Sequence, residues 1–122
     1  MTTVLYVDDE ETIGRVVSRF FERRGDRVLI ARTIAEARGI LGGEEPDAIF
    51  IDMRLGAESG VDLMDWIVRE QPGCVEKVTF VTGDLAVGLA AGSCRGRPVI
   101  QKPFELAQLV HVVERAEPRA GT

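Results

Sequence analysis

Four charged residues of this chain lie directly after short runs that are mostly apolar. The runs end at Val7, Ile51 and Gln101, and the charges that follow them are Asp8, Asp9, Asp52 and Lys102. Runs rich in valine and isoleucine, without strict alternation, are typical of strands in a parallel sheet that is covered on both faces. Because such sheets bind ligands at their carboxyl edge, we expect the four charged side chains to converge on one site.

Clustered carboxylates require a cation. Three of them cannot all stay ionised in a half-buried cleft unless positive charge offsets them, and oxygen ligands favour a hard metal such as Mg²⁺. A carboxylate beside Mg²⁺ can also attack phosphorus and form an aspartyl phosphate. Lys102 would then neutralise the phosphoryl oxygens, and the hydroxyl of Thr82, just past another apolar run, would donate to them. These residue types predict a magnesium site that handles a phosphoryl group.

Strand and helix patterns alternate five times along the chain. Strands are expected over 4–7, 28–31, 48–51, 77–81 and 98–101. Apolar residues at helical spacing indicate four helices, with these inner faces: Ile13, Val16, Val17 and Phe20; Ala37, Ile40 and Leu41; Val61, Met64, Ile67 and Val68; Leu106, Leu109, Val110 and Val113. Gly25 should end the first helix, and a Thr33–Glu36 capping box should begin the second.

The remaining segments are less regular. Residues 54–60 are expected to form a polar loop, and glycines make 83–96 a short or irregular fourth helix of five. The alternation predicts an α/β fold, a doubly wound five-stranded parallel sheet with helices on both faces. At 122 residues, the chain is expected to be a single domain over 1–122, with a tail that frays from about residue 117.

Composition excludes several functions. With a net charge of −5 and no basic stripe, direct nucleic-acid binding is not expected. Cys74 and Cys94 lack metal-ligand spacing and are expected to be free thiols. The chain shows no signal segment and no membrane span, so a cytoplasmic location without membrane contact is expected. His111 falls off the apolar face of its helix and is expected at the surface.

The ordered motifs resemble the receiver domains of two-component response regulators. The match comprises Asp8-Asp9 after the first strand, Asp52 after the third, Thr82-Gly83 after the fourth and Lys102-Pro103-Phe104 after the fifth, and it spans nearly the whole chain. Each motif alone is weak, but their joint order is specific. The resemblance implies a flavodoxin-like sheet with strand order 2-1-3-4-5.

The resemblance also implies residue roles. Asp52 would be the phosphoacceptor, taking a phosphoryl group from a phosphohistidine of a sensor histidine kinase or a histidine phosphotransfer protein. Asp9, assisted by Asp8, would hold Mg²⁺ together with Asp52 and the backbone carbonyl of Arg54. Lys102 would bind the phosphoryl group, and the Thr82 hydroxyl would move toward it on activation. The Lys102–Pro103 peptide bond would be cis.

The sequence departs from the family pattern at two positions. Val99 lies three residues before Lys102, where many receivers carry a tyrosine or phenylalanine switch, so the usual aromatic switch is missing. Gly56 replaces a proline that is common four residues after the phosphoacceptor, which should leave this loop less constrained. The spacing between Thr82 and Lys102 is also slightly short for the family. The overall pattern looks most like receivers attached to hybrid histidine kinases.

Simpler interpretations exist for each residue. Asp8 and Asp9 could cap the helix that follows, Asp52 could begin an ordinary polar loop, and Thr82 could be a turn residue. Two acidic residues in succession after a buried strand exceed what capping needs. The joint presence of the acidic pair, Asp52 and Lys102 favours the phosphoryl site.

Three functions fit such a site to different degrees. The first is a phosphorylation-controlled signalling module that switches a protein interaction surface, with no chemistry beyond its own phosphotransfer and autodephosphorylation. The second is a magnesium-dependent aspartyl-phosphate hydrolase, but Arg54 occupies the position of that class's general acid, and the chain has no room for a substrate-binding cap. The third is a phosphorylation-independent interaction module, which the retained site residues argue against. The output partner is unspecified, and a monomer or weak homodimer is expected.

Arg54 and Asp84 occupy the two loop positions that flank the pocket in receivers. We hypothesise that they pair across its mouth and slow hydrolysis of the phosphoryl-aspartate. An unchanged dephosphorylation rate in Arg54→Ala would reject this idea. As ordinary solvated loop charges, the two would contribute at most about 1 kcal/mol to each other.

Overall fold

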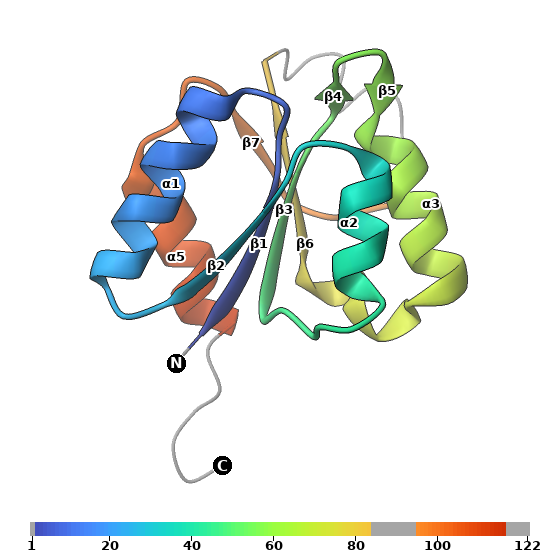
Figure 1. Ribbon diagram of the computed structural model, residues 1–122, viewed down its shortest axis with the longest axis horizontal. Helices are drawn as coiled ribbons and strands as arrows, with labels where there is room; N and C mark the ends of the chain where they lie inside the picture. Colours follow the sequence, from blue (N-terminus) through green and yellow to red (C-terminus); the bar gives the residue numbers. More distant parts are fainter. Residues whose placement is uncertain (1, 84–94, 117–122) are drawn as a thin grey trace, which may run out of the picture.

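The structure is a computed structural model, and it describes residues 2–83 and 95–116 (Figure 1). Its strands are β1 (Thr3–Val7), β2 (Arg27–Ala31), β3 (Ala48–Asp52), β4 (Arg54–Leu55), β5 (Glu58–Ser59), β6 (Val78–Thr82) and β7 (Val99–Gln101). Its helices are α1 (Glu11–Arg23), α2 (Ile34–Leu41), α3 (Gly60–Glu70), the 3₁₀ helix η1 (Pro72–Lys77) and α5 (Leu106–Ala116).

Five strands form one parallel sheet in the order β2-β1-β3-β6-β7. Numbered along the chain, these strands follow the predicted order 2-1-3-4-5, so the fold prediction is confirmed. The central strands are buried along their whole length, which explains their unbroken apolar sequence. Their carboxyl ends therefore lie along a single edge of the sheet.

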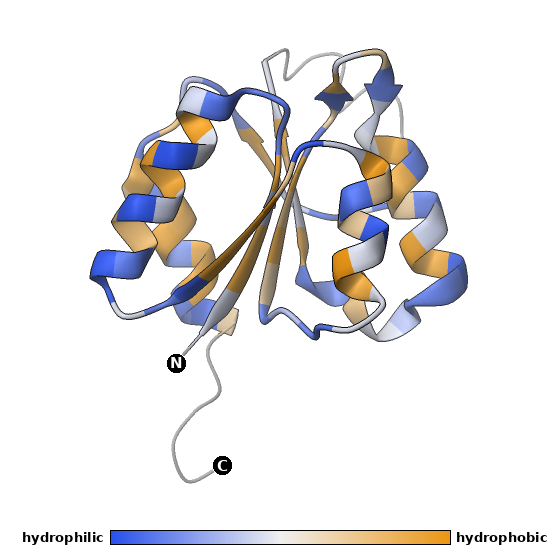
Figure 2. Ribbon diagram, viewed as in Figure 1, coloured by the Kyte–Doolittle hydropathy of each residue, from blue (hydrophilic) through white to orange (hydrophobic). Residues whose placement is uncertain are grey.

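Helices cover both faces of the sheet, with α1 and α5 on one side and α2 and α3 on the other (Figure 1). Two apolar cores result. One packs α1 and α5 residues such as Phe21 and Leu109 against Tyr6 and Phe50, and the other packs α2 and α3 against Leu5 and Ile49. Figure 2 shows the apolar strands enclosed between helices whose outer faces are polar.

The buried face of α1 differs from the predicted one. Val17 is buried as expected, but Val16 is 51% exposed, and Phe21 is fully buried in its place. The prediction for Val16 was wrong because Phe21 shares the helical face of Gly14 and Val17, and this face lies against the sheet. Gly25, with φ of +91°, follows the end of the helix as predicted.

The segment after Asp52 is more ordered than the predicted polar loop. Arg54 pairs with Ser59, and Leu55 pairs with Glu58, in a small antiparallel hairpin. Gly56 is the first residue of the two-residue turn and has φ of +63°, which the ring of a proline forbids. Oε1 of Glu58 accepts a hydrogen bond of 3.2 Å from the backbone N–H of Ile34, which ties the hairpin to the first turn of α2.

Gly60, the first residue of α3, allows a close approach between this helix and β3. A Cβ atom at this position would overlap the carbonyl oxygen of Asp52 and lie 2.8 Å from Cγ2 of Ile51. The backbone N–H of Gly60 also donates to the carbonyl oxygen of Met53. Glycine is therefore required here to hold α3 against the end of the strand that carries Asp52.

Some predictions concern parts of the chain that the structure does not describe. The fourth helix, Asp84 and Cys94 lie in residues 84–94, and the fraying tail lies in 117–122. Cys74 is a free, buried thiol, and burial raises its pKa. His111 is exposed, as predicted. Within the described residues, no helix has the length and apolar character needed to cross a membrane.

Candidate phosphoryl and metal site

The predicted functional residues meet at the carboxyl edge of the sheet. Asp8 directly follows β1, Asp52 ends β3, Thr82 ends β6 and Lys102 directly follows β7. The strand register makes neighbours of these ends, because Asp52 pairs with Val81 and Thr82 pairs with Gln101. The four residues come from strands that are distant in sequence, which is the arrangement expected of a binding site in an open parallel sheet.

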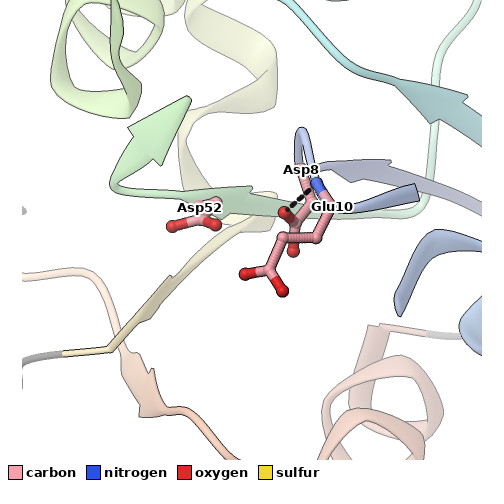
Figure 3. A group of neighbouring side chains, drawn as sticks. All are labelled: Asp8, Glu10 and Asp52. Carbon is pink, nitrogen blue, oxygen red and sulfur yellow. Dashed lines mark hydrogen bonds between the residues drawn. The ribbon is translucent and has the colours of Figure 1, made fainter. Parts of the chain in front are cut away.

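Three carboxylates form the centre of the site. One oxygen each from Asp8, Glu10 and Asp52 lies within 4.8 Å of the others (Figure 3). Asp8 is 1% exposed and Asp52 is 5% exposed, whereas Glu10 lies at the surface. This group of three side chains, called the acidic pocket below, therefore has two buried carboxylates and one exposed carboxylate.

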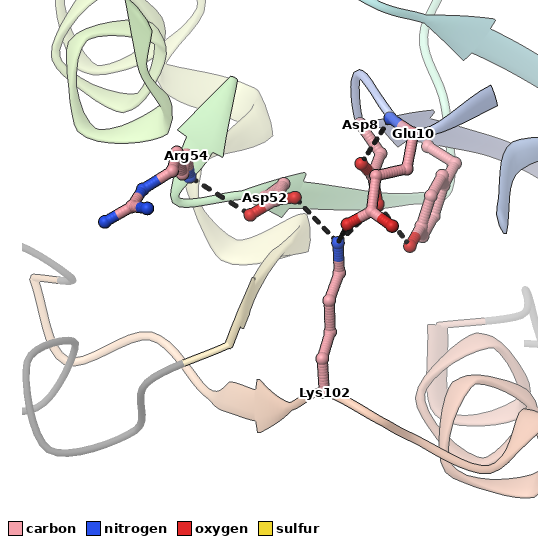
Figure 4. A network of polar contacts seen from close by, with 6 residues as sticks. Asp8, Glu10, Asp52, Arg54 and Lys102 are labelled. Atoms are coloured by element: carbon pink, nitrogen blue, oxygen red, sulfur yellow. Dashed lines mark hydrogen bonds and ion pairs between the residues drawn. The ribbon is translucent and has the colours of Figure 1, made fainter. Parts of the chain in front are cut away.

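Lys102 supplies the positive charge of this pocket. Its Nζ atom lies 2.8 Å from Oδ2 of Asp52 and 2.9 Å from both Oδ2 of Asp8 and Oε1 of Glu10 (Figure 4). An ammonium group has three N–H donors, so each carboxylate can accept one of them. With one ammonium among three carboxylates, the formal charge of the pocket is about −2 when all groups are ionised.

Neighbouring groups hold the two buried carboxylates in position. The Tyr6 hydroxyl donates to Oδ2 of Asp8 at 3.0 Å, and the backbone N–H of Glu10 donates to Oδ1 of Asp8 at 2.9 Å. The backbone N–H of Arg54 donates to Oδ1 of Asp52 at 3.0 Å. Both oxygens of each buried aspartate are therefore hydrogen-bonded, as buried charge requires.

Burial and charge shift the pKa values in the pocket. Burial raises the pKa of Asp52, although the Lys102 hydrogen bond and the Arg54 N–H both favour its ionised form. Burial works against the charge of Lys102, but its hydrogen bonds to Asp52, Asp8 and Glu10 raise its pKa above the usual range. Burial, together with the Asp8 charge, also raises the pKa of Tyr6. The surroundings thus favour a charged lysine, whereas burial works against ionisation of Asp52.

The structure brings together Asp8, Asp52 and Lys102 as the sequence predicted. Asp9 lies next to the hairpin turn, with Oδ2 3.7 Å from the position that a Cβ atom would take on Gly56, and it does not belong to the Asp8, Glu10 and Asp52 group. Its role as a metal ligand stays a prediction. So do the metal-binding role of the Arg54 carbonyl and the switching role of the Thr82 hydroxyl.

The backbone around Lys102 is fixed by one hydrogen bond and includes the predicted cis peptide bond. The backbone N–H of Lys102 donates to the carbonyl oxygen of Thr82 at 2.7 Å, which joins the ends of β6 and β7. Thr82 itself is 6% exposed. The Lys102–Pro103 peptide bond is cis, as the resemblance implied. Val99 packs against the core on the α2 and α3 side of the sheet.

Sequence reasoning missed two members of the site. Glu10 continues the acidic run that begins at Asp8, and this run of negative charge was the available signal for it. Tyr6 looked like a core residue of β1, and it is one, being 1% exposed. A buried tyrosine hydroxyl nevertheless needs a partner, and the acidic residue two positions later on the same face of the strand was the obvious candidate.

The donor set fits a hard divalent cation. All three gathered side chains offer carboxylate oxygens, which are the ligands that Mg²⁺ and Ca²⁺ prefer. With three carboxylates and one ammonium, the group carries excess negative charge, which favours binding of a further cation.

Similarity to known proteins agrees with this geometry. The family model of the response regulator receiver domain matches residues 4–114. The chain is 31% identical over 115 residues to the nitrogen assimilation regulatory protein NtrX of Azorhizobium caulinodans, covering 93% of this chain and 25% of that protein. It is 28% identical to the non-phosphorylated HemR receiver domain of Leptospira biflexa, with a TM-score of 0.81 and full coverage of both chains.

A further neighbour carries the relevant chemistry. A response regulator from Burkholderia pseudomallei, solved with a phosphorylated aspartic acid, a calcium ion and citrate, is 26% identical, with a TM-score of 0.80 over 93% of this chain and 66% of that one. The parallel sheet and its carboxyl edge, which carries clustered carboxylates and a lysine, fit the receiver class of signalling domain. The chain belongs to the response regulator receiver domain family of two-component systems. It spans between 24% and 60% of the length of several curated relatives.

Proposed function

We propose that Asp52 accepts a phosphoryl group from the phosphohistidine of a sensor histidine kinase or a histidine phosphotransfer protein. The observation that carries this proposal is the contact of 2.8 Å between Asp52 Oδ2 and the Lys102 ammonium at the bottom of the acidic pocket. A lysine in contact with the acceptor carboxylate is within reach of phosphoryl oxygens that this carboxylate would carry. The phosphorylated aspartic acid in the Burkholderia pseudomallei relative supports the same chemistry.

In the proposed reaction, a carboxylate oxygen of Asp52 forms a bond to phosphorus while the bond from phosphorus to the histidine nitrogen breaks. The histidine keeps the electron pair of that bond. Lys102 neutralises charge on the phosphoryl oxygens, and the Arg54 N–H holds the second oxygen of Asp52. The chain then acts on no substrate other than its own phosphoryl group, which it loses by slow hydrolysis.

Asp8, Asp9, Asp52 and the Arg54 carbonyl are the proposed ligands of Mg²⁺. The cation would supply the positive charge that a phosphoryl group needs in a pocket already rich in carboxylates. Burial of Asp8 behind Tyr6 keeps one carboxylate fixed at the back of the pocket. Asp9, beside the hairpin turn at Gly56, is the more accessible of the acidic pair.

The phosphodonor protein is proposed to dock on an apolar groove next to the site. This groove has a volume of about 450 Å³ and is lined by Ile13, Val16, Val17, Pro103, Phe104 and Leu106, together with Glu10 and Lys102. Val16 is the exposed large apolar residue among the described residues. Since the groove shares Glu10 and Lys102 with the acidic pocket, a protein seated in it would be close to Asp52.

The output of the domain is proposed to pass through Thr82 and its surroundings. Thr82 ends the strand next to β3 and is joined to Lys102 through its carbonyl oxygen. Val99 offers neither a ring nor a hydroxyl that could swing between two positions. Regulation of a protein interaction surface by this chain would therefore not use the aromatic switch of many receivers.

Phosphorylation by acetyl phosphate tests the proposed function. With Mg²⁺ present, intact-protein mass should rise by one phosphoryl group in the wild type and stay unchanged in Asp52→Asn. Asp62→Asn, an exposed substitution on α3, is the matched control and should behave as the wild type. Phosphorylation of Asp52→Asn, or an unmodified wild type, would overturn the assignment.

A further inference from the structure

Glu10 has no part in the phosphotransfer proposed above, yet its side chain is committed to the site. It is the N-cap residue of α1, but its side chain makes no capping hydrogen bond. Oε1 instead accepts a hydrogen bond of 2.9 Å from Nζ of Lys102, a residue 92 positions later in the chain. An N-cap side chain usually stabilises its helix by accepting hydrogen bonds from the free N–H groups of the first turn. The Glu10 side chain contacts Lys102 instead.

The exposure of the three carboxylates separates Glu10 from the other two. The side chain of Asp8 is 0% exposed and that of Asp52 is 7% exposed, but that of Glu10 is 56% exposed. Glu10 is therefore the member of the group at the mouth of the pocket (Figure 4). Among the three carboxylates, that of Glu10 is therefore the one most accessible to an incoming phosphodonor.

Lys102 must exchange partners when a phosphoryl group arrives. Its three N–H donors match the three carboxylates that surround it, and a phosphoryl group on Asp52 brings new oxygens that compete for the same donors. Asp8 is buried and also held by Tyr6, so its contact with Lys102 is costly to break. The contact with exposed Glu10 is the one that solvent can replace at low cost.

We propose that Glu10 is a positioning residue that holds Lys102 in a three-carboxylate arrangement and thereby slows phosphorylation of Asp52. The inference rests on the function proposed above and adds to it a restraint on the lysine. With acetyl phosphate as donor, the Asp52 oxygen bonds to phosphorus, the bond from phosphorus to the acetate oxygen breaks, and acetate leaves with the electron pair. Release of Lys102 from Glu10 accompanies this transfer.

Two substitutions of Glu10 distinguish its contact with Lys102 from a simple effect of its negative charge. Glu10→Gln removes the charge, whereas Glu10→Asp keeps the charge but shortens the side chain by one methylene and withdraws it from Lys102. If Glu10 acts through Lys102, both variants should be phosphorylated by acetyl phosphate about three times faster than the wild type at saturating Mg²⁺. If Glu10→Asp matches the wild type, the proposal is wrong.

Glu11→Gln is the matched control. Glu11 is the next residue, its side chain is 55% exposed, and it pairs with Arg15 and not with Lys102. Its loss removes the same formal charge and should leave the rate within about 1.5-fold of the wild type. An equal acceleration in Glu11→Gln would show that net charge alone is responsible and would overturn the proposal.

A second measurement does not depend on phosphorylation. The ammonium signal of Lys102 in ¹H–¹⁵N NMR spectra of the metal-free protein should shift in Glu10→Gln and in Glu10→Asp, and should be unchanged in Glu11→Gln. Unchanged Lys102 signals in both Glu10 variants would overturn the restraint while leaving the phosphoacceptor role of Asp52 intact. A wild type that takes no phosphoryl group would reject the proposed function itself.

Discussion

Nζ of Lys102 and Oδ2 of Asp52 lie 2.8 Å apart, although the two residues are separated by 50 positions in the sequence. This contact joins the end of β3 to the segment after β7. It also places the ammonium of Lys102 among the carboxylates of the pocket. In the protein without a metal ion, the ammonium of Lys102 offsets the repulsion among the three neighbouring carboxylates. The stability of the domain and its affinity for a divalent cation are therefore coupled.

Replacing Lys102 with methionine should reveal this coupling. The variant leaves three close carboxylates without a cation and should lose about 1–3 kcal/mol of unfolding free energy in EDTA. Mg²⁺ should restore more stability to this variant than to the wild type, because a ligand that binds only the folded state stabilises it. Urea unfolding with and without Mg²⁺ measures both effects. Lys77→Met, at the only other lysine, should show neither.

The pH dependence of stability should report the raised pKa of Asp52. A carboxyl group whose pKa is higher in the folded state favours folding at low pH, and this contribution is lost as pH rises from the ordinary aspartate pKa through the folded-state pKa. The difference in unfolding free energy between Asp52→Asn and the wild type should therefore shift in favour of the variant between about pH 3 and pH 7. A difference that is constant across this range, in metal-free buffer, would contradict the direction of the shift.

The hydrogen bond from Tyr6 to Asp8 should make a measurable contribution to stability. Tyr6→Phe removes a buried donor from a charged acceptor and should cost about 1–3 kcal/mol. A double-mutant cycle with Asp8→Asn isolates the pairwise term, which should be at least about 0.5 kcal/mol. Additive effects of the two substitutions in chemical denaturation would show that the hydroxyl and the carboxylate do not interact.

Two glycines in helices should respond in opposite ways to alanine. Gly60→Ala places a Cβ atom against the Asp52 carbonyl oxygen and should destabilise the protein by about 2 kcal/mol or more. In α2, a Cβ atom added at Gly39 would meet no atom within 4 Å, so Gly39→Ala should stabilise the protein by about 0.5–1 kcal/mol. Thermal unfolding of both variants provides the comparison, and Gly60→Ala should also slow phosphorylation of the displaced Asp52. A Gly60→Ala protein as stable as the wild type would show that α3 can move away from β3 without cost.

The groove beside the site predicts a difference between protein and small-molecule donors. Val16→Asp should change stability by less than about 0.5 kcal/mol because Val16 is exposed. It should slow transfer from a phosphohistidine protein by about tenfold, since a charge would enter an apolar contact. The rate with acetyl phosphate should be unaffected. Ala35→Asp, on the opposite side of the sheet, is the control; equal effects of the two would argue against docking in the groove.

The sheet and the site edge could be predicted because their signals are strong. Buried parallel strands leave unbroken apolar runs, and the charges that end these runs must lie along one edge. The predicted face of α1 was partly wrong because Ile13, Val17 and Phe20 are compatible with two adjacent apolar stripes, and tertiary packing selected the one that contains Phe21. The hairpin at Arg54–Ser59 was missed because strands of two residues carry no detectable alternation.

The contacts inside the site depend on distances that sequence patterns do not contain. Glu10 reaches Lys102 only because the end of β1 and the segment after β7 meet at the same edge, and the direction of its side chain is a property of the folded chain. Tyr6 was predicted as part of a strand and was correctly placed in the core. The hydrogen bond from its hydroxyl to Asp8 was not predicted, although the spacing of two residues along an extended segment places both side chains on one face.

The hydrogen bond from the Ile34 N–H to Glu58 connects the hairpin after β3 to the start of α2. The hairpin over residues 54–59 begins two positions after Asp52, and the backbone N–H of Arg54 donates to Oδ1 of that carboxylate. A shift of the hairpin must either carry the start of α2 with it or break this bond. The segment between β2, the border strand opposite β7, and α2 is thus attached to the hairpin that follows Asp52.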